Sequence, residues 1–494
     1  MYFNIDKIGN DILVRDNEGD YRVKNFSPKL WQPSYNTGTH QSIEGQKLNP
    51  VSYDNCNQFR QVLEEYRNSG SIVYGTKDVI SQYITEHYPD TSNFDKTKLK
   101  IFNIDIEVES SEGFPKPDEA KYPITAITIF YNDLIYVWGM PPEGQTFSTQ
   151  DKNITYKEFS NELNLISDFL DFWGKESPHV ITGWNIEFFD IPYIHNRVFK
   201  LLGKTSVKKL SPWGIVTEKM VRNSYGKENQ AFLIKGVSIL DYLALYKKFE
   251  LSPRENYKLN TIANVELGVE KLDYTEYGNL QGLYEKNYQK FIEYNIKDVD
   301  IVERLDHKKK LIDLCLAVAY KAKVNYNSVF SPIATWTSIV WNYLYENGII
   351  TTINFKRNEK SESFLGAYVM EPEKGLHKWV ASFDLASLYP NIIIQYNLGP
   401  DTLVMPQDLS PDMLNHYANV DIDNLLNKKI DLEYLKEENI TMSANGYYFK
   451  NNKKSFFSVL MEKLFNERKE EKGKMIKCKK LLSFIEEEIK IRGL

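Results

Sequence analysis

Strands and helices alternate from Lys100 to about residue 311, and this alternation constrains the fold more than any other feature of the chain. The segment opens with Lys100–Val108, whose residue pattern predicts a strand. Alternating strand and helix patterns favour an α/β domain with a central sheet. The chain has 494 residues, which exceeds one ordinary hydrophobic core, so further domains are expected on either side.

Shorter patterns predict the elements on either side of this unit. Residues 1 to about 98 contain short alternating strands, such as Tyr21–Lys24, followed by a helical pattern from Gln58 to Arg67. Leu311–Tyr320 and Thr335–Tyr345 are apolar at helical spacing and are expected to be core helices.

The charge of the chain indicates an enzyme rather than a protein that only coats nucleic acid. The formal net charge is −6, from 61 Lys and Arg against 67 Asp and Glu, whereas nucleic-acid-coating domains are basic. Acid clusters that carry metal ions would account for this balance. The lysine-rich run Lys450–Lys480 alternates with glutamates such as Glu467 and Glu470, and therefore also fits a solvated helix face.

Cysteine usage and hydropathy indicate the compartment. Cys56, Cys315 and Cys478 are far apart and odd in number, which predicts neither a metal knuckle nor a disulfide framework and favours a reducing cytoplasm. Met1–Asp6 does not resemble a signal peptide, and no apolar run approaches the ~20 residues of a membrane span. No membrane partner is expected.

Four acids and a tyrosine form the first candidate site. Asp105 and Glu107 lie two apart on the predicted strand, so both carboxylates leave the same face. Two like charges within an apolar strand are unfavourable unless a cation neutralises them. Asp190 lies between apolar neighbours, and Tyr294 and Asp298 are four apart on one face of a predicted helix.

Each of these residues also has an ordinary structural interpretation. Acids are common on exposed strands, Asp190 before Ile-Pro can cap a helix, and a Tyr–Asp pair often decorates a helix surface. Together, however, three carboxylates can hold two Mg²⁺ ions, Asp298 completes the cage, and the Tyr294 hydroxyl can orient an attacking water. In order and spacing the set resembles the tyrosine subclass of DEDD-type 3′–5′ exonucleases.

The second candidate site is centred on Asp384. A β-rich segment is expected to start near Phe364 and to run into Ser382–Pro390, which predicts a short strand, a carboxylate and a turn into a helix begun by Pro390. Asp384 followed by an aromatic at Tyr389 suits nucleotidyl transfer, with one metal ligand and a flat surface for a sugar. Transfer with two metals roughly 3.5–4 Å apart needs a second carboxylate, and none is recognised after Tyr389. The structural alternative is a strand-end cap with a packed tyrosine.

Taken together, these motifs resemble family B DNA polymerases, most closely the replicative enzymes of T-even-type phages. The resemblance runs along nearly the whole chain and is carried by Asp105–Val108, Ile181–Asn185, Asp190–Tyr193, Ser238–Leu243, Ser328–Ile333 and Ser382–Pro390. It implies an α/β multidomain protein. The implied parts are an N-terminal mixed α/β domain at 1–98 completed by about 312–355, an RNase H-like exonuclease domain at 99–311, a partial palm at 356–455 and the first part of the helical fingers at 456–494.

The resemblance also implies roles for individual residues. The exonuclease site would use Tyr294 and hold two Mg²⁺ or Mn²⁺ ions through Asp105, Glu107, Asp190 and Asp298. In the palm, Asp384 and the Leu385 carbonyl would hold metal, and Tyr389 would stack beneath the incoming deoxyribose and exclude a 2′-hydroxyl. Arg468 and Lys472, on one helix face, would meet the triphosphate. The implied nucleotide-binding set is Leu385, Ser387, Leu388, Tyr389, Arg468 and Lys472.

Three further stretches are compared with the family. Phe364–Ala367 resembles an element that contacts template, with Phe in place of its tyrosine and therefore without the hydroxyl. Lys271 matches a basic residue of the exonuclease site. Asn223–Gly226 falls where the family has a hairpin that helps to part primer from template.

Three elements of this family are not found in the sequence: the second fingers helix, the palm Asp-Thr-Asp-Ser element and the thumb. Gly493-Leu494 falls near the expected fingertip. We therefore expect the N-terminal subunit of a split, phage-encoded replicative DNA polymerase that acts in the cytoplasm of a bacterial host. It would bind primer–template DNA and dNTPs, and a second chain would supply the remaining palm, fingers and thumb and any contact with a sliding clamp.

Three alternatives remain open at this point. The first is an engineered truncation of an intact polymerase. The second is a free-standing 3′–5′ exonuclease with a vestigial palm, which the retained Asp384, Tyr389, Arg468 and Lys472 argue against. The third is a non-catalytic nucleic-acid-binding or assembly module, which the complete set of exonuclease acids argues against.

Overall fold

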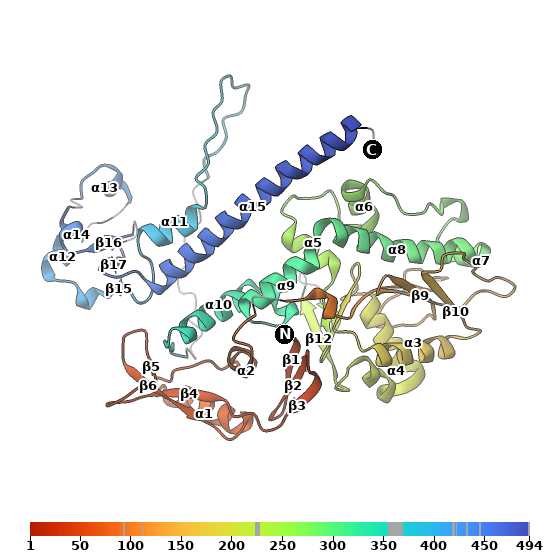
Figure 1. Cartoon of the computed structure of the whole chain (residues 1–494), viewed down its shortest axis with the longest axis horizontal. Helices are drawn as coiled ribbons and strands as arrows, with labels where there is room; N and C mark the ends of the chain where they lie inside the picture. The colour runs from red at the N-terminus through yellow and green to blue at the C-terminus, as the bar shows by residue number, and fades with distance from the viewer. Residues whose placement is uncertain are drawn as a thin grey trace. The chain divides into compact units, whose positions relative to one another are not determined.

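The structure is a computed structural model that describes residues 1–91, 94–111, 113–222, 228–353, 369–416, 420, 422–430, 433–443 and 446–492. Figure 1 shows the helices and strands coloured along the chain. Contacts divide the chain into two compact units. Unit 1 comprises Met1–Leu30 and Pro50–Asn342, and unit 2 comprises Trp31–Asn49 and Tyr343–Leu494. Two stretches singled out in the sequence, Phe364–Ala367 and Asn223–Gly226, lie outside the described residues, as does Gly493-Leu494.

Unit 1 is built on a mixed six-stranded sheet with the order β10-β9-β8-β7-β11-β14. β7, β8 and β9 are antiparallel neighbours, whereas β11 pairs parallel with both β7 and β14, and β10 pairs parallel with β9. The strands are β7 (Ile101–Val108), β8 (Ile124–Tyr131), β9 (Leu134–Gly139), β10 (Ile154–Glu158), β11 (Val180–Thr182) and β14 (Ser238–Ile239). The sequence prediction of an α/β unit from residue 100 is confirmed.

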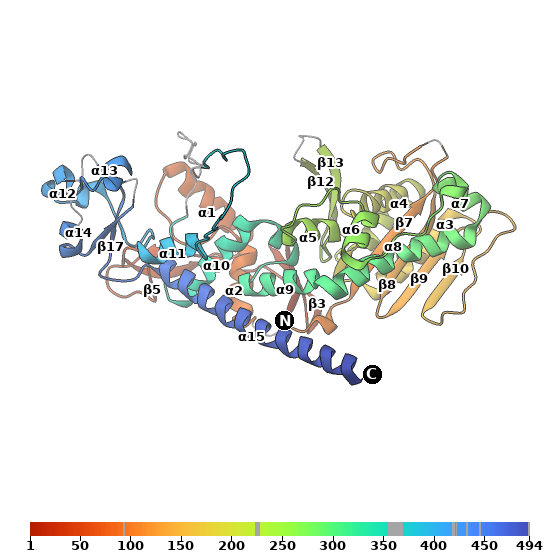
Figure 2. The same cartoon turned by 90° about the horizontal axis from the view of Figure 1, so that it is seen from above.

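Helices cover both faces of this sheet (Figure 2). On one face, α3 and α4 pack against Phe102, Ile104 and Ile127 of the sheet. On the other face, Phe291 and Ile292 of α8 pack against the sheet. The helices of this region are α3 (Glu162–Glu176), α4 (Asp190–Val207), α5 (Tyr242–Phe249), α6 (Leu259–Leu267), α7 (Leu280–Lys286) and α8 (Tyr288–Lys309), with short 3₁₀ turns at Lys96–Lys98, Lys208–Leu210 and Thr275–Tyr277.

The N-terminal sheet packs against residues beyond α8. Its strands β1 (Tyr2–Ile8), β2 (Asp11–Asp16) and β3 (Gly19–Val23) are antiparallel. The Tyr2 hydroxyl donates to the Val324 carbonyl at 2.8 Å, and the Tyr320 hydroxyl donates back to the Tyr2 carbonyl at 2.6 Å. Residues near 320 therefore complete the packing of the first strand.

Most of the helices and strands predicted outside the central unit are found close to their predicted bounds. The remaining elements of the first 350 residues are β4 (Lys29–Pro33), β5 (His40–Gln41), β6 (Lys47–Ser52), α1 (Cys56–Ser69), α2 (Val79–His87), β12 (Val216–Arg222), β13 (Glu228–Ile234), α9 (Leu311–Ala322), a 3₁₀ turn at Tyr326–Phe330 and α10 (Pro332–Glu346). A strong local pattern explains this agreement for α9, which buries an apolar stripe that includes Leu311, Cys315 and Ala319.

Unit 2 contains a small sheet and one long helix. The antiparallel strands have the order β15-β17-β16 and share a core with Met413 and Leu435. The Ser458 hydroxyl of α15 donates to the Ile393 carbonyl of α11 at 3.0 Å, which ties these two helices together. The elements are β15 (Leu403–Val404), β16 (Ile440–Met442), β17 (Tyr448–Lys450), α11 (Leu388–Gln395), α12 (Pro411–His416), α13 (Ile422–Leu426), α14 (Glu433–Glu437), α15 (Phe456–Arg492) and a 3₁₀ turn at Pro406–Asp408.

The prediction of a β-rich segment leading to Asp384 is wrong for the described residues 369–387, which contain no strand. A strand needs a hydrogen-bonded neighbour, and β15, β16 and β17 pair with one another instead. The helix begins at Leu388 rather than Pro390, after Ser387 takes a left-handed conformation with φ 55°. Proline is tolerated in the first helical turn because the N–H that it lacks has no helical partner there.

Within the described part of the chain, no helix combines the length and the apolar character needed to cross a membrane.

Candidate functional site

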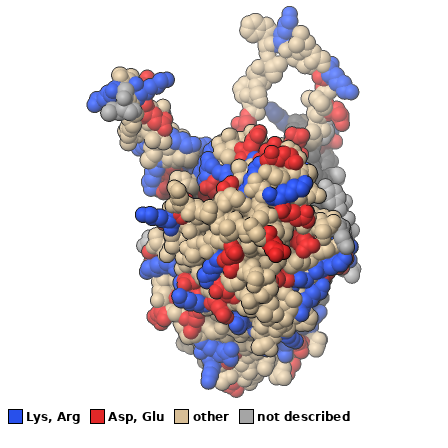
Figure 3. Space-filling view, turned by 90° about the vertical axis from the view of Figure 1, so that its right-hand side faces the viewer, with Lys and Arg blue, Asp and Glu red and all other residues tan. Residues whose placement is uncertain are grey.

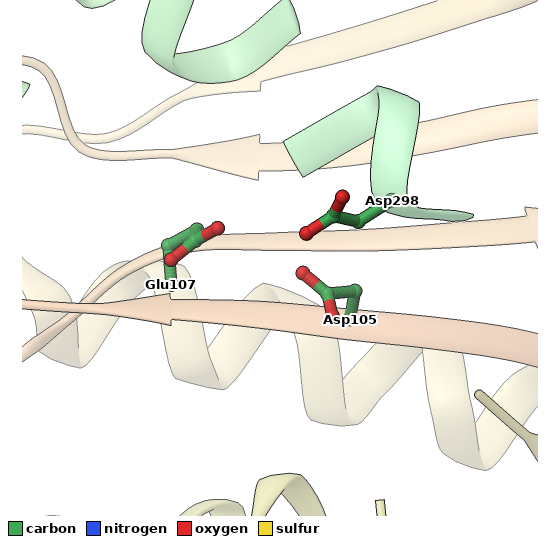
Figure 4. A group of neighbouring side chains, drawn as sticks. All are labelled: Asp105, Glu107 and Asp298. Atoms are coloured by element: carbon green, nitrogen blue, oxygen red, sulfur yellow. The ribbon is translucent and has the colours of Figure 1, made fainter. Parts of the chain in front are cut away.

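Three carboxylates converge between the central sheet and α8. Asp105 and Glu107 project from β7, and Asp298 projects from α8 toward them (Figure 4). Each side chain offers one oxygen such that the three oxygens all lie within 4.8 Å of one another. Alternation along β7 places the first two on one face of the sheet, and α8 packs on that same face.

Burial and mutual repulsion make the ionised forms of this cluster unfavourable. Burial, together with the neighbouring carboxylates of Asp190 and Asp298, raises the pKa of Asp105 well above its usual range. Burial and Asp298 raise the pKa of Glu107 to about 8. Burial also raises the pKa of Asp298. A cation at this position would remove the like-charge repulsion.

Asp190 reaches the same cleft from α4. It is the first residue of that helix, and Phe189 occupies the N-cap position without a side-chain cap, so the N-cap interpretation of Asp190 is wrong. Instead, Asp190 Oδ1 accepts a hydrogen bond from the backbone N–H of Ile106 at 3.0 Å. Ile106 lies between Asp105 and Glu107, so this bond places a fourth acid beside the pair. Burial raises the pKa of Asp190 to about 7.

Lys271 connects Tyr294 to the carboxylates. Its Nζ lies 3.0 Å from the Tyr294 hydroxyl and 2.5 Å from Asp298 Oδ2. Burial acts to lower the pKa of Lys271, but Asp298 and Tyr294 outweigh it and raise that pKa. The Tyr294 ring packs edge-on against Tyr274, with ring centres 5.3 Å apart. The structure thus brings Lys271 beside Tyr294 and Asp298, from which it is 23 and 27 residues away in sequence.

The residues at this site fit a divalent cation. Asp298 Oδ1 is buried and has no hydrogen-bond partner among the described residues, although a buried carboxylate oxygen is costly to leave unsatisfied. Carboxylate oxygens are hard ligands of the kind that Mg²⁺ and Mn²⁺ prefer. The donor set, the unpartnered oxygen and the repulsion among the acids all favour a bound metal.

Sequence reasoning missed two residues that hold this site in place. Asn295 Nδ2 donates to Asp105 Oδ2 at 2.6 Å. Asp241 accepts hydrogen bonds from the backbone N–H groups of Asn185 at 3.1 Å and Glu187 at 3.0 Å, and so fixes the turn that precedes Asp190. A polar residue between Tyr294 and Asp298 on a buried helix was the available signal for Asn295. For Asp241 the signal was a possible helix cap.

The carboxylates line a cleft of about 870 Å³. Aromatic side chains line it, and Phe114 is 82% exposed with its ring centre 5.4 Å from that of Phe189. Lysines also line the cleft. The remaining aromatic and basic lining residues are Trp184, Tyr257, Tyr274, Tyr294, Lys247, Lys258 and Lys271. These groups suit an anionic ligand that carries flat aromatic rings.

The outer surface gives a less specific signal than the cleft. On the face of the molecule drawn in Figure 3, Lys and Arg side chains are interspersed with Asp and Glu. Mixed charge of this kind agrees with the net charge of −6, and it leaves the cleft as the more informative feature for ligand recognition.

The second candidate site is open to solvent. Asp384 and Leu385 are exposed, and Tyr389 is 76% exposed, so the interpretation of Tyr389 as a packed tyrosine is wrong. Arg468 Nη1 of α15 lies 3.2 Å from the Ser387 hydroxyl. Lys472 is exposed one helical turn beyond Arg468. The structure therefore brings a predicted triphosphate contact to the motif that carries Asp384.

A second acid cluster is not formed around Asp384 by the residues that the structure describes. Within that part of the chain, the one group of three or more His, Cys, Asp or Glu residues close enough to hold a metal ion is Asp105, Glu107 and Asp298.

Comparison with known proteins gives matches over most of the chain. Residues 50–262 match DNA polymerase family B, exonuclease domain, and residues 335–485 match DNA polymerase family B. The chain is 33% identical to the DNA-directed DNA polymerase of Escherichia phage RB69, over 99% of this chain and 55% of the relative. It is 32% identical to the DNA-directed DNA polymerase of Enterobacteria phage T4, over 96% of this chain and 54% of the relative. The chain thus spans about half the length of these curated relatives.

Proposed function

Because this chain belongs to family B of the DNA polymerases, we propose that it carries a two-metal 3′–5′ exonuclease and part of the polymerase site of a phage replicative enzyme. The observation that carries the exonuclease proposal is the convergence of Asp105, Glu107 and Asp298, together with the unpartnered oxygen of Asp298. Residues 99–311 would form this domain, with an RNase H-like fold.

The acids would hold two Mg²⁺ or Mn²⁺ ions. Asp105, Glu107, Asp190 and Asp298 are the ligands that we propose. Bound divalent ions of this kind activate water and stabilise the charge that develops on a phosphate during hydrolysis. The Ile106 N–H holds Asp190 in place, so this ligand is oriented before an ion arrives.

Tyr294 would orient the attacking water. Its oxygen accepts a hydrogen bond from the Lys271 ammonium, which leaves the tyrosine O–H free to act as a donor toward water or a phosphate oxygen. Burial and Asp298 raise the pKa of Tyr294, so the hydroxyl keeps its proton at neutral pH. Lys271 also contacts Asp298 Oδ2 and thereby sets the hydroxyl relative to the carboxylates.

The cleft supports single-stranded DNA as the substrate. Stacking of bases on aromatic side chains contributes about 1–3 kcal/mol per base in proteins that bind single strands. Phe114 offers an exposed face at the edge of the cleft, while Lys247 and Lys258 offer positive charge for phosphates. A frayed 3′ end would therefore place its last phosphodiester over the acids.

The exonuclease proposal is tested with single-stranded DNA labelled at either end. With Mg²⁺, the chain should shorten a 5′-labelled strand stepwise and release the label of a 3′-labelled strand at once. Asp298→Asn should lower the rate by orders of magnitude, because it removes charge stabilisation worth several kcal/mol. Tyr294→Phe should be milder, since the metal ligands remain. An unchanged rate in the double variant Asp105→Ala with Glu107→Ala would contradict the assignment.

Unit 2 would contribute half of the polymerase site. Residues 356–455 would form part of the palm and residues 456–494 the first part of the fingers. Residues 1–98, completed by about 312–355, would form an N-terminal domain. Asp384 and the Leu385 carbonyl would hold metal, and the contact between Arg468 and Ser387 supports a triphosphate site between the two segments. The other proposed nucleotide contacts are Leu388, Tyr389 and Lys472.

The polymerase site would also use polypeptide beyond residues 1–494. The relatives are longer than this chain, and α15 exposes apolar side chains along its second half. These residues are Met475, Ile476, Leu481, Leu482, Phe484, Ile485, Ile489 and Ile491. We propose that the rest of the palm, fingers and thumb covers this surface, provides the second carboxylate beside Asp384, and carries any contact with a sliding clamp.

A second chain is the arrangement that the sequence leads us to expect, and the alternative is continuation of the same polypeptide. Primer extension by residues 1–494, with and without the candidate second chain, tests whether further polypeptide is needed, and robust templated synthesis by residues 1–494 alone would contradict the proposal. In either arrangement the substrates would be primer–template DNA and dNTPs, in the cytoplasm of a bacterial host.

A further inference from the structure

A fully buried amide lies directly behind the carboxylate cluster. The side chain of Asn295 on α8 is 0% exposed, and its Nδ2 donates to Asp105 Oδ2 at 2.6 Å. Its Oδ1 accepts a hydrogen bond from the hydroxyl of Thr128 on β8, which is also 0% exposed. Thr128 is the direct cross-strand partner of Asp105. A closed connection therefore runs from β7 to α8, on to β8 and back to β7.

The direction of the hydrogen bonds in this connection is fixed by chemistry. An ionised carboxylate can only accept, so the NH₂ group of Asn295 must face Asp105, and the amide oxygen must then face Thr128. The Thr128 hydroxyl, which can donate, holds the amide in that orientation. A fixed donor on Oδ2 restrains rotation of the Asp105 carboxylate.

We propose that Asn295 and Thr128 are positioning residues, which hold the Asp105 carboxylate in the orientation that a divalent cation needs. The inference rests on the proposed function, because that cation is the metal of the exonuclease site. Partners of this kind behind metal ligands typically change metal affinity or activity by about 10–100-fold when they are removed.

Direct titration of Mn²⁺ into residues 1–494, followed by electron paramagnetic resonance of the free ion, tests this proposal without DNA. Asn295→Leu, which keeps the branched shape of the side chain but has no donor, should weaken Mn²⁺ binding by about 10–100-fold. Thr128→Val should weaken binding by a smaller factor, because the amide stays but is free to turn. Thr128→Ser keeps the hydroxyl and should bind nearly as the unmodified chain does.

Two controls separate positioning from general damage to the fold. The Thr182 hydroxyl on β11 donates to the Leu240 carbonyl at 2.7 Å and is also buried. Thr182→Val therefore removes a comparable buried hydrogen bond from the same sheet, and should lower the unfolding temperature without changing Mn²⁺ affinity. Adding Thr128→Val to Asn295→Leu should weaken binding no further, because Thr128 acts through the amide.

The outcomes distinguish this inference from the proposed function. If Asp298→Asn leaves Mn²⁺ affinity unchanged, the metal site itself is wrong and the inference falls with it. If Asp298→Asn abolishes binding while Asn295→Leu and Thr128→Val bind as tightly as Thr182→Val, the positioning role alone is overturned. Should Asn295→Leu fail to fold, the comparison of Thr128→Val with Thr128→Ser decides the question in the same way.

Discussion

Lys271 is the one cation that contacts both Asp298 and Tyr294 among the described residues. Its positive charge lowers the pKa values of Asp105, Glu107 and Asp298 and so offsets part of the effect of burial. At the scale of the residue, this ammonium has two functions. It orients the tyrosine hydroxyl, and it favours ionised carboxylates.

Replacing Lys271 should separate these functions. Lys271→Met keeps the aliphatic length but removes the charge, so the pKa values of the acids rise further and protons compete more strongly with metal. We expect exonuclease activity at pH 7 to fall by about 10–100-fold, within the range for loss of a group behind metal ligands. The acidic limb of the pH–rate profile should move to higher pH.

Lys271→Arg is the matched control for this prediction. It keeps the charge and changes the geometry, so the acidic limb should stay in place even if the maximal rate falls. A profile of Lys271→Met that keeps the position of its acidic limb would show that the charge of Lys271 does not act on the acids.

At the scale of the elements, apolar side chains of α8 pack against β8 and β9, while the acid of α8 is repelled by the acids of β7. The folded-state pKa values of Glu107 and Asp190 are about 8 and about 7, above the usual values of about 4 for unfolded carboxyl groups. A carboxyl group with a raised folded-state pKa lowers stability wherever it is ionised in both states. The stability that the protonated Glu107 carboxyl gives the folded state is therefore fully present below about pH 4. It is lost as pH rises through about 8.

A metal-dependent pH profile of stability should follow from this repulsion. With a chelator present, the unfolding temperature of the unmodified chain should fall between pH 5 and pH 8.5. The fall should be smaller for Glu107→Gln, whose side chain at position 107 has no charge to lose or gain. Mn²⁺ should raise the unfolding temperature more at pH 8 than at pH 5, because protons occupy the carboxylates at low pH. Thermal unfolding followed by circular dichroism gives both values. Parallel pH curves for the two proteins would contradict the repulsion.

Sequence patterns predicted the elements of this site better than the contacts between them. Period-two alternation placed Asp105 and Glu107 on one face, and the spacing of Tyr294 and Asp298 placed them on one helix face. The link from Thr128 through Asn295 to Asp105 depends on the pairing of β7 with β8, which no local pattern specifies.

The segment before Asp384 is an element that the local sequence pattern predicted wrongly. Its composition predicts a strand, but a strand forms only where another strand offers its backbone, and residues 369–387 have no such neighbour among the described residues. Strand propensity depends on context in this way. The contact of Arg468 with Ser387 spans 81 residues of sequence, so the resemblance to a family, rather than a local pattern, was needed to predict their joint role.

At the scale of the whole molecule, the two proposed sites lie in different compact units. The acids of the exonuclease site belong to unit 1, and Asp384 and Tyr389 belong to unit 2. A substitution at one site should therefore leave the other chemistry intact. In the assembled polymerase, Asp384→Ala should abolish templated synthesis and spare 3′ excision.

Tyr389 gives a prediction that concerns the assembled enzyme alone. Its ring is exposed in this chain, as expected for a surface that meets a nucleotide. Tyr389→Ala should raise ribonucleotide insertion while sparing much of the deoxynucleotide rate, and Tyr389→Phe is the matched control that keeps the ring. Primer extension with dNTPs against rNTPs measures both.

Loss of excision together with synthesis in Asp384→Ala would point to a folding defect or to a single shared site.

The most direct measurement of the central claim is anomalous X-ray diffraction from crystals of this chain soaked in Mn²⁺. We predict anomalous density bounded by the carboxylates of Asp105, Glu107 and Asp298, at two positions when a single-stranded oligonucleotide is also bound with its 3′ end in the cleft. The density should disappear in Asp298→Asn. Crystals of an active protein that bind Mn²⁺ elsewhere and leave these three carboxylates without metal would contradict the claim.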